Sequence, residues 1–237
     1  REGNKKTGAQ MILNKKFKYL TPDRITTEEG RTYSIFDEKL PSVTTILHKV
    51  PDPQKAFALA RWRQKLGEKE ANKVRDNAAR RGTIMHRILE GAIKEEGHMD
   101  LSELGQEAGT MAQALLDNGF LTALEEVWGT EMMLGYPGLY AGAADVIGVY
   151  KGRECIIDFK QSNNPKKLDH CRDYFNQGAA YAMAHNIMYG TKIQACVILV
   201  SVAGGEIQEF WVKDKEFQRF CWEWLRKVDE FYRLSGT

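Results

Sequence analysis

The hexapeptide CIIDFK, residues 155–160, follows shortly after LYAGAADVIG, residues 139–148, and these two stretches decide the fold. Side chains alternate along a β-strand, so Asp158 and Lys160 are expected on one face, just after two apolar residues. For an isolated D-x-K pattern, an ordinary ion pair at the end of a strand is the commoner arrangement. The earlier stretch changes this expectation, because it carries a carboxylate of its own.

Asp145 is the carboxylate of that earlier stretch, and it follows three small residues, 142–144. Small side chains let another backbone, a metal or a substrate phosphate approach closely. A buried carboxylate without a partner is costly, so Asp145 needs one. A divalent cation shared by Asp145 and Asp158 would satisfy both.

Two pairs of polar residues are spaced one helical turn apart. His86 and Glu90 lie in RRGTIMHRILE, and Gln177 and Tyr181 lie in NQGAAYA, so each pair shares one helix face. A lone helical histidine is more often a packed residue than a metal ligand, and Gln and Tyr at this spacing are common. Neither pair alone indicates a site.

The C-terminal half is expected to form a sheet covered by helices. Three strand-like segments in a meander are followed by helix, strand, strand and helix, and the Gly204-Gly205 turn joins the last two strands. The expected ranges are strands Glu131–Leu134, Tyr140–Tyr150 and Glu154–Gln161, helix Leu168–Tyr189, strands Gln194–Val202 and Glu206–Val212, and helix Asp214–Leu234.

The N-terminal half is expected to be mainly helical after a hairpin. Ser42 is a good N-cap in PSVTTIL, and the segment Pro51–Pro53 separates this helix from the next. The expected ranges are hairpin strands Phe17–Leu20 and Arg31–Phe36, helical patterning over Gln54–Ile93 with joints at Gly67 and Gly82, and a helix over Leu101–Trp128.

No linker or repeat divides the chain, which predicts an α/β fold with a central mixed β-sheet flanked by helices and a helical N-terminal region. We expect one domain over 1–237, in which 11–128 is the hairpin plus a mainly helical part and 129–237 is the α/β core. Met11 is a plausible native start, and residues 1–10 are set aside as a leader.

Composition is that of a globular protein, with 43% hydrophobic residues and 28% charged residues. No apolar run is long enough for a membrane span and no signal-like stretch opens the chain, so we expect an intracellular protein. The net charge of +2 hides an uneven distribution: Lys49–Lys94 carries twelve Lys/Arg and five Asp/Glu, whereas Glu95–Tyr150 carries ten Asp/Glu and no Lys or Arg. These segments are either solvated helix faces or a phosphate-binding stripe beside a carboxylate cluster.

Taken together, the motifs resemble those of the PD-(D/E)xK nuclease superfamily, in its RecB-like branch. The motifs occur in the order Gly82-x-x-x-His86-x-x-x-Glu90, Glu131, Gly142-x-x-Asp145, Asp158-x-Lys160 and Gln177-x-x-x-Tyr181. PSVTTIL and the basic stretch with RWRQKLG further resemble the group of mitochondrial genome maintenance exonuclease and its phage relatives. The resemblance covers Pro41 to the C-terminus and leaves only the hairpin outside.

The resemblance implies a site for one or two Mg²⁺ or Mn²⁺ ions. Asp145, Asp158 and the backbone carbonyl of Phe159 would offer hard oxygen ligands, and His86 a nitrogen ligand that tilts the preference towards Mn²⁺. Lys160 would orient or help deprotonate the attacking water and stabilise charge on the phosphate. Glu131 would contact a water bound to the metal or brace the catalytic strand, and Glu90 would hold His86 in position.

The resemblance also implies DNA contacts, with Gln177 and Tyr181 beside the active site. The basic helices would form part of a channel, through Arg61, Arg63, Arg80 and Arg81, and Trp62 would stack on bases unless it is an ordinary core residue. The cysteine spacing does not match the iron-sulfur nucleases of this branch, and no phosphate-binding loop of the ATPase type occurs, so we expect neither an iron-sulfur cluster nor ATP.

The expected function is a metal-dependent exonuclease on single-stranded DNA with free ends. The alternatives are a double-strand-resecting exonuclease or an endonuclease on the same core, and a nucleic-acid-binding protein without turnover. Protein partners are unknown. The expected location is the cytoplasm of a bacterial or phage-infected cell, or the mitochondrial matrix in a eukaryote.

Overall fold

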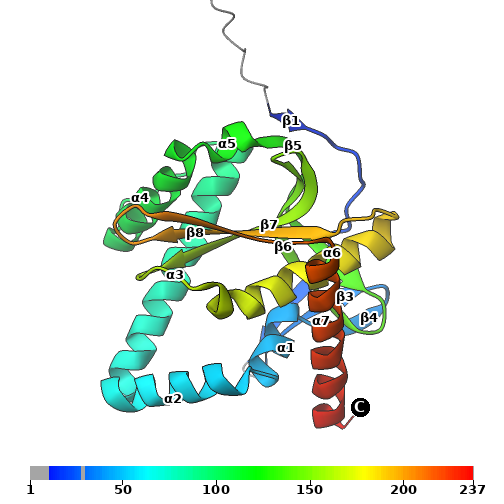
Figure 1. Cartoon of the computed structure of the whole chain (residues 1–237), viewed down its shortest axis with the longest axis horizontal. Coiled ribbons are helices and arrows are strands. Elements are labelled where there is room, and N and C mark those ends of the chain that lie inside the picture. The colour runs from blue at the N-terminus through cyan, green and yellow to red at the C-terminus, as the bar shows by residue number, and fades with distance from the viewer. Residues whose placement is uncertain (1–10, 28–29, 237) are drawn as a thin grey trace, which may run out of the picture.

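A mixed sheet of six strands runs through the middle of the protein, and helices cover both of its faces (Figure 1). The computed structural model describes residues 11–27 and 30–236, so the expected leader 1–10 lies outside the described residues. The strand order is β1-β5-β6-β7-β8-β9, and a second sheet has the order β2-β3-β4. The predicted α/β class with a central mixed sheet is confirmed.

The helices and strands occur in the following order along the chain. They are β1 (Ile12–Leu13), β2 (Asp23–Thr27), β3 (Gly30–Ile35), β4 (Glu38–Pro41), α1 (Val43–Lys49), α2 (Pro53–Leu66), α3 (Glu68–Ile93), α4 (Glu103–Asp117), α5 (Phe120–Ala123), β5 (Leu124–Tyr136), β6 (Tyr140–Tyr150), β7 (Arg153–Ser162), a 3₁₀ turn (Leu168–Cys171), α6 (Arg172–Tyr189), β8 (Ala195–Val202), β9 (Ile207–Lys213) and α7 (Asp214–Ser235).

The predicted meander is present, because β5, β6 and β7 pair antiparallel in sequence order. Strand β7 then pairs parallel with β8, and β8 pairs antiparallel with β9. Every residue of β8 is buried, as expected for an apolar strand that is covered on both faces. The long crossover between β7 and β8 contains α6, which places α6 directly over the strands that carry the candidate site.

Each face of the main sheet has its own apolar core. Helices α3, α4 and α5 pack on one face, through Met85, Leu89 and Leu115. Helices α1, α6 and α7 pack on the other, with Phe175 and Trp224 fully or almost fully buried. Helix α2 is different: it has no buried residue and lies at one end of the molecule, away from the sheet (Figure 1). No helix in the described ranges combines the length and the apolar composition that crossing a bilayer requires.

The start of α1 and the joint at Gly67 agree with the prediction. The Ser42 hydroxyl accepts a hydrogen bond from the Thr45 amide at 3.0 Å, which caps α1. Gly67 separates α2 from α3 with a φ of 83°, which a glycine adopts without strain. Gly82 was expected to be a second joint, and this is wrong, because it lies inside α3. Packing of the α3 turns around it outweighs the low helix propensity of one glycine.

The predicted hairpin and the predicted helix over Leu101–Trp128 need correction. Strand β3 pairs with β2 rather than with Phe17–Leu20, which is not a strand. Helix α4 ends at Asp117, and Leu124–Trp128 belongs to β5, so the expected boundary between 128 and 129 falls inside a strand. Strands β1, β2 and β4 were not predicted.

Phe17 and Tyr19 serve tertiary packing instead of a strand. They pack with Trp128 around His185, and the His185 side chain is fully buried. The Tyr19 hydroxyl lies 3.1 Å from His185 Nε2, and the Thr191 hydroxyl lies 2.8 Å from Nδ1. This cluster fastens the N-terminal segment to the end of α6.

We predict that His185 makes stability depend on pH between about 6.5 and 4. Burial, reinforced by nearby Lys16, lowers the pKa of His185 to about 4, whereas the unfolded chain titrates near 6.5. In this window only the unfolded chain is protonated, so the free energy of unfolding falls as pH falls, by at most about 1.4 kcal/mol per pH unit. Chemical denaturation of wild type and His185→Gln at several pH values measures this slope.

The variant is expected to lose part of the slope between pH 6.5 and 4. His48→Gln is the matched control, because it makes the same replacement at a histidine that is exposed on α1. Equal slopes in His185→Gln and wild type would show that the His185 pKa is not shifted.

Candidate active site

The candidate site lies at a fork in the main sheet. Strands β6 and β7 are paired from Tyr150 and Arg153 as far as Val146 and Ile157. The next residue on each strand is a predicted aspartate, Asp145 on β6 and Asp158 on β7. The ladder stops there, and the Phe159 amide donates a hydrogen bond of 2.8 Å to the Asp145 carboxylate instead of to a backbone carbonyl.

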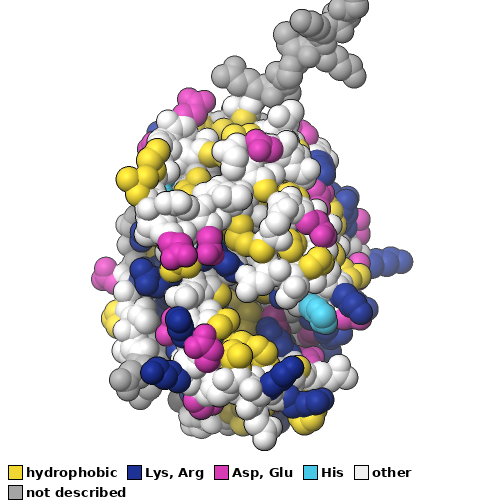
Figure 2. Space-filling model, turned by 90° about the vertical axis from the view of Figure 1, so that its left-hand side faces the viewer, with side chains coloured by type: hydrophobic (Ala, Val, Ile, Leu, Met, Phe, Trp, Pro, Cys, Tyr) yellow, Lys and Arg dark blue, Asp and Glu magenta, His cyan; other side chains and the backbone are white. Residues whose placement is uncertain are grey.

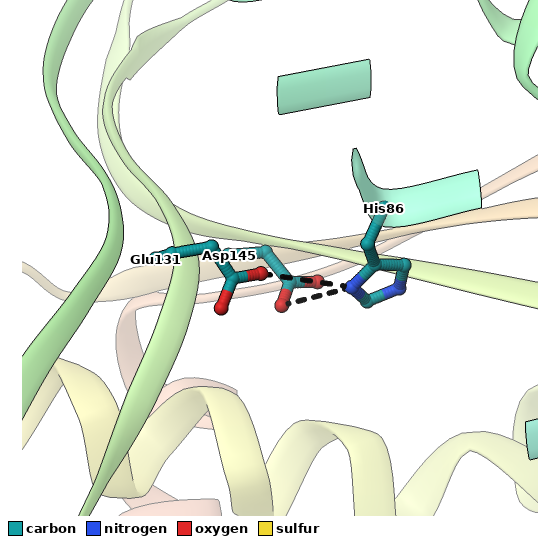
Figure 3. A group of neighbouring side chains, drawn as sticks. All are labelled: His86, Glu131 and Asp145. Atoms are coloured by element: carbon teal, nitrogen blue, oxygen red, sulfur yellow. Dashed lines mark ion pairs between the residues drawn. The ribbon is translucent and has the colours of Figure 1, made fainter. Parts of the chain in front are cut away.

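Three side chains from three different elements meet at this fork (Figure 3). His86 comes from α3, and its Nδ1 lies 3.4 Å from Asp145 Oδ1 and 3.9 Å from Glu131 Oε1. One ligand atom from each side chain lies within 4.8 Å of the others, which makes the three a possible metal-binding group.

Glu131 takes its place opposite Asp145 through the register of β5 and β6. The flanking pairs are Thr130 with Val146 and Met132 with Ala144. Glu131 has a φ of 52°, which is unusual for a residue with a side chain and is found mainly where the surrounding structure imposes it. The strand is therefore distorted at the one position that adds a carboxylate to the group.

The backbone of Phe159 fixes the orientation of His86. Its carbonyl accepts a hydrogen bond of 2.9 Å from His86 Nε2, so Nε2 carries a proton and Nδ1 faces the two carboxylates. A metal-binding histidine usually has its second nitrogen held in this way. The Phe159 carbonyl oxygen thus accepts one hydrogen bond from His86, and its expected role as a metal ligand through the second lone pair stays a prediction.

Asp158 and Lys160 form an ion pair on the neighbouring strand, as the alternation along β7 predicted. Asp158 is 1% exposed, and neither of its carboxylate oxygens has a hydrogen-bond partner among the described residues, although one contacts the Lys160 ammonium. The Lys160 ammonium also lies 5.1 Å from the centre of the Tyr174 ring. A buried carboxylate with free acceptor capacity is the fourth potential ligand of the site.

The charged groups shift one another's pKa values in opposite directions. Burial raises the pKa of Asp158 to about 6, even though Lys160 opposes this change. Burial also acts against the charged forms of Asp145, Lys160 and His86, but the charges of their neighbours outweigh it. His86 and Lys160 lower the pKa of Asp145, and Asp158 and Asp145 raise the pKa of Lys160. Asp145 and Glu131 raise the pKa of His86 to about 10. Opposite charges are thus packed together at the fork.

A cavity of about 410 Å³ opens onto this group. It reaches from α3 to α6 and to the small sheet. Its lining includes His86, Glu131 and Asp145, whereas Asp158 and Lys160 adjoin it from β7 without lining it. The other lining residues are Arg24, Arg31, Tyr33, Ser42, Val43, Thr44, Thr83, Arg87, Glu90, Gly142, Ala143, Gln177 and Tyr181.

Gln177 and Tyr181 lie together in the cavity wall, as their spacing on α6 predicted. The Gln177 amide donates a hydrogen bond of 3.1 Å to the Tyr181 hydroxyl. Burial raises the pKa of Tyr181 well above its usual value, so the hydroxyl stays protonated. The small residue at 142 is required for this packing, because a Cβ on Gly142 would lie 2.8 Å from Tyr181 Cε1.

Glu90 lines the cavity but does not hold His86, which corrects the expected role. Its carboxylate accepts from Lys94 at 2.6 Å and from Thr130 at 3.3 Å, whereas His86 is oriented by Phe159. Thr130 is a buried residue of β5, so this hydrogen bond holds the Glu90 carboxylate against that strand.

The predicted DNA-binding residues of the basic helices fall into two groups. Arg61, Trp62 and Arg80 are exposed on α2 and α3. Arg63 is bonded to Glu68 and Asn72, and Arg81 is bonded to Glu107, Gln161 and Asn163, so these two guanidinium groups are engaged within the protein. Figure 2 shows a hollow on the face that carries α2, α3 and α4, with both basic and acidic side chains around it.

Sequence reasoning missed three arginines in the cavity wall, Arg24, Arg31 and Arg87. Arg87 directly follows the predicted site residue His86 in the sequence, and this position could have indicated it. Arg24 and Arg31 belong to the small sheet, which pattern analysis placed outside the site. Only the tertiary packing of that sheet on β6 brings them to the cavity.

Comparison with known proteins supports the nuclease resemblance. No protein-family model matches the chain. Mitochondrial genome maintenance exonuclease 1 from Mus musculus is 28% identical over 202 residues, and that from Homo sapiens is 28% identical over 204 residues; each match covers 81% of this chain. The chain spans 59% and 58% of the length of these relatives. The predicted resemblance to this group of nucleases is confirmed.

One solved structure is also similar, a chain from Eubacterium rectale described as "Putative exonuclease". It has a TM-score of 0.48 and 16% sequence identity, and the match covers 68% of each chain.

We predict that Gly142→Ala destabilises the protein because the added methyl group collides with Tyr181. Overpacking of a buried position costs about 1–3 kcal/mol. Thermal unfolding of the variant should show a lowered midpoint. Gly109→Ala adds the same methyl group on α4 where nothing lies within 4 Å, and it is expected to leave the midpoint unchanged or raised. Equal midpoints for the two variants would mean that Tyr181 is free to move.

Proposed function

We propose that this chain is a metal-dependent deoxyribonuclease that degrades single-stranded DNA from a free end. The observation that carries the proposal is the convergence of His86, Glu131 and Asp145 on one fork of the sheet, beside the Asp158–Lys160 ion pair. The exonuclease name of the relatives supports the same activity.

The residues at the fork suit Mg²⁺ or Mn²⁺. Carboxylate oxygens are the ligands that these hard cations prefer, and an imidazole nitrogen suits Mn²⁺ better than Mg²⁺. Asp158 Oδ1, which has no hydrogen-bond partner among the described residues, adds an acceptor that a cation would use. We therefore assign His86 Nδ1, Asp145, Asp158 and Glu131 as ligands of one or two ions, with Phe159 orienting His86. A bound cation would neutralise charge on the phosphate and lower the pKa of a water molecule.

The chain's own residues provide the remaining functions. Lys160 holds a positive charge beside Asp158, where it stabilises charge that develops on the scissile phosphate and orients the attacking water. Gln177 and Tyr181 form one rigid polar unit in the cavity wall and position the strand next to the reacting phosphate.

The preference for a single strand with a free end rests on the basic helices. Arg61 and Arg80 are exposed and can bind phosphates, and exposed Trp62 and Phe57 offer aromatic faces for bases. If α2 and α3 enclose the strand, the substrate must enter from a terminus. A double-strand-resecting exonuclease and an endonuclease are the alternatives on the same core. Mitochondrial DNA is a further proposed substrate, suggested by the names of the relatives.

The metal-site prediction is that Asp145→Asn, Asp158→Asn and Lys160→Ala each lower the cleavage rate at least about 100-fold. The first two variants each remove a charged metal ligand, and the third removes the cation that stabilises charge on the reacting phosphate. EDTA should abolish wild-type cleavage of a labelled single strand in Mg²⁺ or Mn²⁺. Glu154→Gln is the matched control on β7, since Glu154 is exposed and is expected to keep full activity.

Thermal unfolding gives a readout that does not depend on cleavage. Mn²⁺ should raise the unfolding midpoint of wild type and of Glu154→Gln, and this shift should be lost in Asp145→Asn, because a ligand that binds only the folded state stabilises it. Cleavage that resists EDTA, or an Asp145→Asn variant with near wild-type turnover, would refute the metal assignment. DNA binding without any turnover would indicate the inactive binding protein.

The threading prediction is that a circular single strand resists digestion under conditions that consume the linear form. Each phosphate contact to a single strand contributes roughly 0.7 to the slope of log affinity against log salt, so Arg61→Ala with Arg80→Ala should reduce this slope by about 1 to 1.5. The contrasting double variant is Arg63→Ala with Arg81→Ala, whose guanidinium groups are engaged within the protein. It should change the slope less.

Product analysis on 5′-labelled and 3′-labelled strands, a duplex and a circle separates the remaining alternatives. Rapid cutting of the circle, together with an unchanged salt slope in the Arg61 and Arg80 double variant, would favour an endonuclease with an open cleft.

A further inference from the structure

Two arginines of the small sheet line the same cavity as the candidate active site. Arg24 lies on β2 and Arg31 on β3, and both line the cavity that His86, Glu131 and Asp145 also line. None of the sequence motifs lies on β2 or β3. The cavity thus has one acidic wall whose side chains suit cations and one cationic wall.

The strand register explains why both arginines point the same way. In the antiparallel pair β2–β3, Arg24 is directly opposite Tyr33, and Thr26 is directly opposite Arg31. Directly opposed residues share a face, and so do residues two apart on one strand. Tyr33 is 1% exposed and packs with Ala141 of β6. The face that anchors the small sheet to the main sheet therefore also carries Arg24 and Arg31.

Arg31 is held in place by its backbone. Its amide donates to the Thr45 hydroxyl at 2.9 Å, and its carbonyl accepts from the Thr45 hydroxyl at 3.1 Å and from the Ser42 amide at 2.8 Å. Gly30 permits this close approach, since a Cβ there would lie 2.7 Å from the Thr45 methyl carbon. These contacts fix where the Arg31 side chain starts relative to the cavity.

The cavity arginines differ from most other arginines of the protein. Ion pairs within the described residues engage Arg63, Arg75, Arg81, Arg153, Arg172, Arg219 and Arg233. Within the same ranges neither Arg24 nor Arg31 pairs with a carboxylate, and the buried Nε of Arg31 has no hydrogen-bond partner. A buried donor without a partner is unfavourable, so an acceptor that enters the cavity would relieve a cost already present.

We propose that Arg24 and Arg31 bind a phosphate of the nucleic-acid strand next to the phosphate that is cleaved. The inference rests on the proposed nuclease function. A guanidinium presents paired N–H donors in a planar fork that fits phosphate oxygens, and it keeps its charge at all physiological pH values. The cleaved phosphate occupies the wall of His86 and Asp145, so a strand that crosses the cavity brings its neighbouring phosphate to the wall of Arg24 and Arg31.

The experiment combines arginine variants with charge-neutral linkages. Short single strands carry one methylphosphonate linkage at successive positions beside the cleaved bond, and kcat/KM is measured in Mn²⁺ for wild type, Arg31→Ala, Arg24→Ala and Arg31→Lys. Lys39→Ala is the matched control. Lys39 lies on β4 directly opposite Ser34 of β3, so this variant loses a charge from the other face of the same small sheet.

Wild type and Lys39→Ala are expected to lose about tenfold or more in kcat/KM at one neighbouring linkage. Arg31→Ala should lose a similar factor on the unmodified strand and lose little more when that linkage is neutral, because the contact is already gone. Arg31→Lys should recover part of the rate, since it keeps the charge and loses the fork. This pattern supports the proposal, and unfolding midpoints check that each variant is folded.

Two results overturn it. Unchanged kcat/KM in both Arg31→Ala and Arg24→Ala, or full sensitivity to the neutral linkage in both variants, would show that these arginines do not contact a phosphate. Binding and cleavage by the wild-type protein distinguish failure of the proposed nuclease function from failure of the phosphate contact. If wild type binds strands without cutting them, the same set of linkages is read by affinity, and an Arg31-dependent loss at one linkage upholds the phosphate contact while refuting turnover. Absence of both binding and cleavage in wild type overturns both proposals.

Discussion

The hydrogen bond from the Phe159 amide to the Asp145 carboxylate sets the geometry of the whole site. Strands β6 and β7 separate at this point, so the Phe159 backbone loses its partner on β6, and a buried amide must find another acceptor. The Asp145 side chain provides that acceptor. The Phe159 carbonyl in turn accepts from His86 of α3, which fixes the position of that helix turn relative to the fork. One residue without side-chain chemistry therefore orients both a carboxylate and an imidazole.

The C-terminal elements and the chemistry of the strands could be predicted because both depend on local patterns. The alternation along β7 placed Asp158 and Lys160 on one face, and the ranges expected for β6, β8 and α7 differ from the structure by at most a residue or so at each end. The helix over Leu101–Trp128 was overextended because the sequence LEEVW, residues 124–128, is compatible with either a helix or a strand. Pairing with β6 decides for a strand, and pairing is a property of the tertiary fold.

Other features of the site depend on contacts that no local pattern reveals. Glu131 acquires its place beside His86 through a register and a backbone conformation that pattern analysis cannot see. Arg63 and Arg81 looked like phosphate ligands by composition, and their partners Glu68, Glu107 and Gln161 became visible only in the fold. Arg24 and Arg31 were overlooked because β2 and β3 resemble no motif, although packing of Tyr33 on β6 carries them to the cavity.

Charge balance connects the two walls of the cavity. Glu131 and Asp145 repel a phosphodiester, so a site built on carboxylates must supply positive charge close by if a nucleic acid is to approach it. Lys160 supplies part of that charge within the cluster itself, where the neighbouring carboxylates raise its pKa. This positive group is committed to its ion pair with Asp158, so the phosphate that flanks the reacting one needs a further cationic group. The guanidinium groups of Arg24 and Arg31 meet this requirement from a separate sheet. Hydrogen bonds between Arg31 of β3 and Thr45 of α1 keep that sheet in place, so the two arginines do not weaken the attraction of the carboxylates for cations.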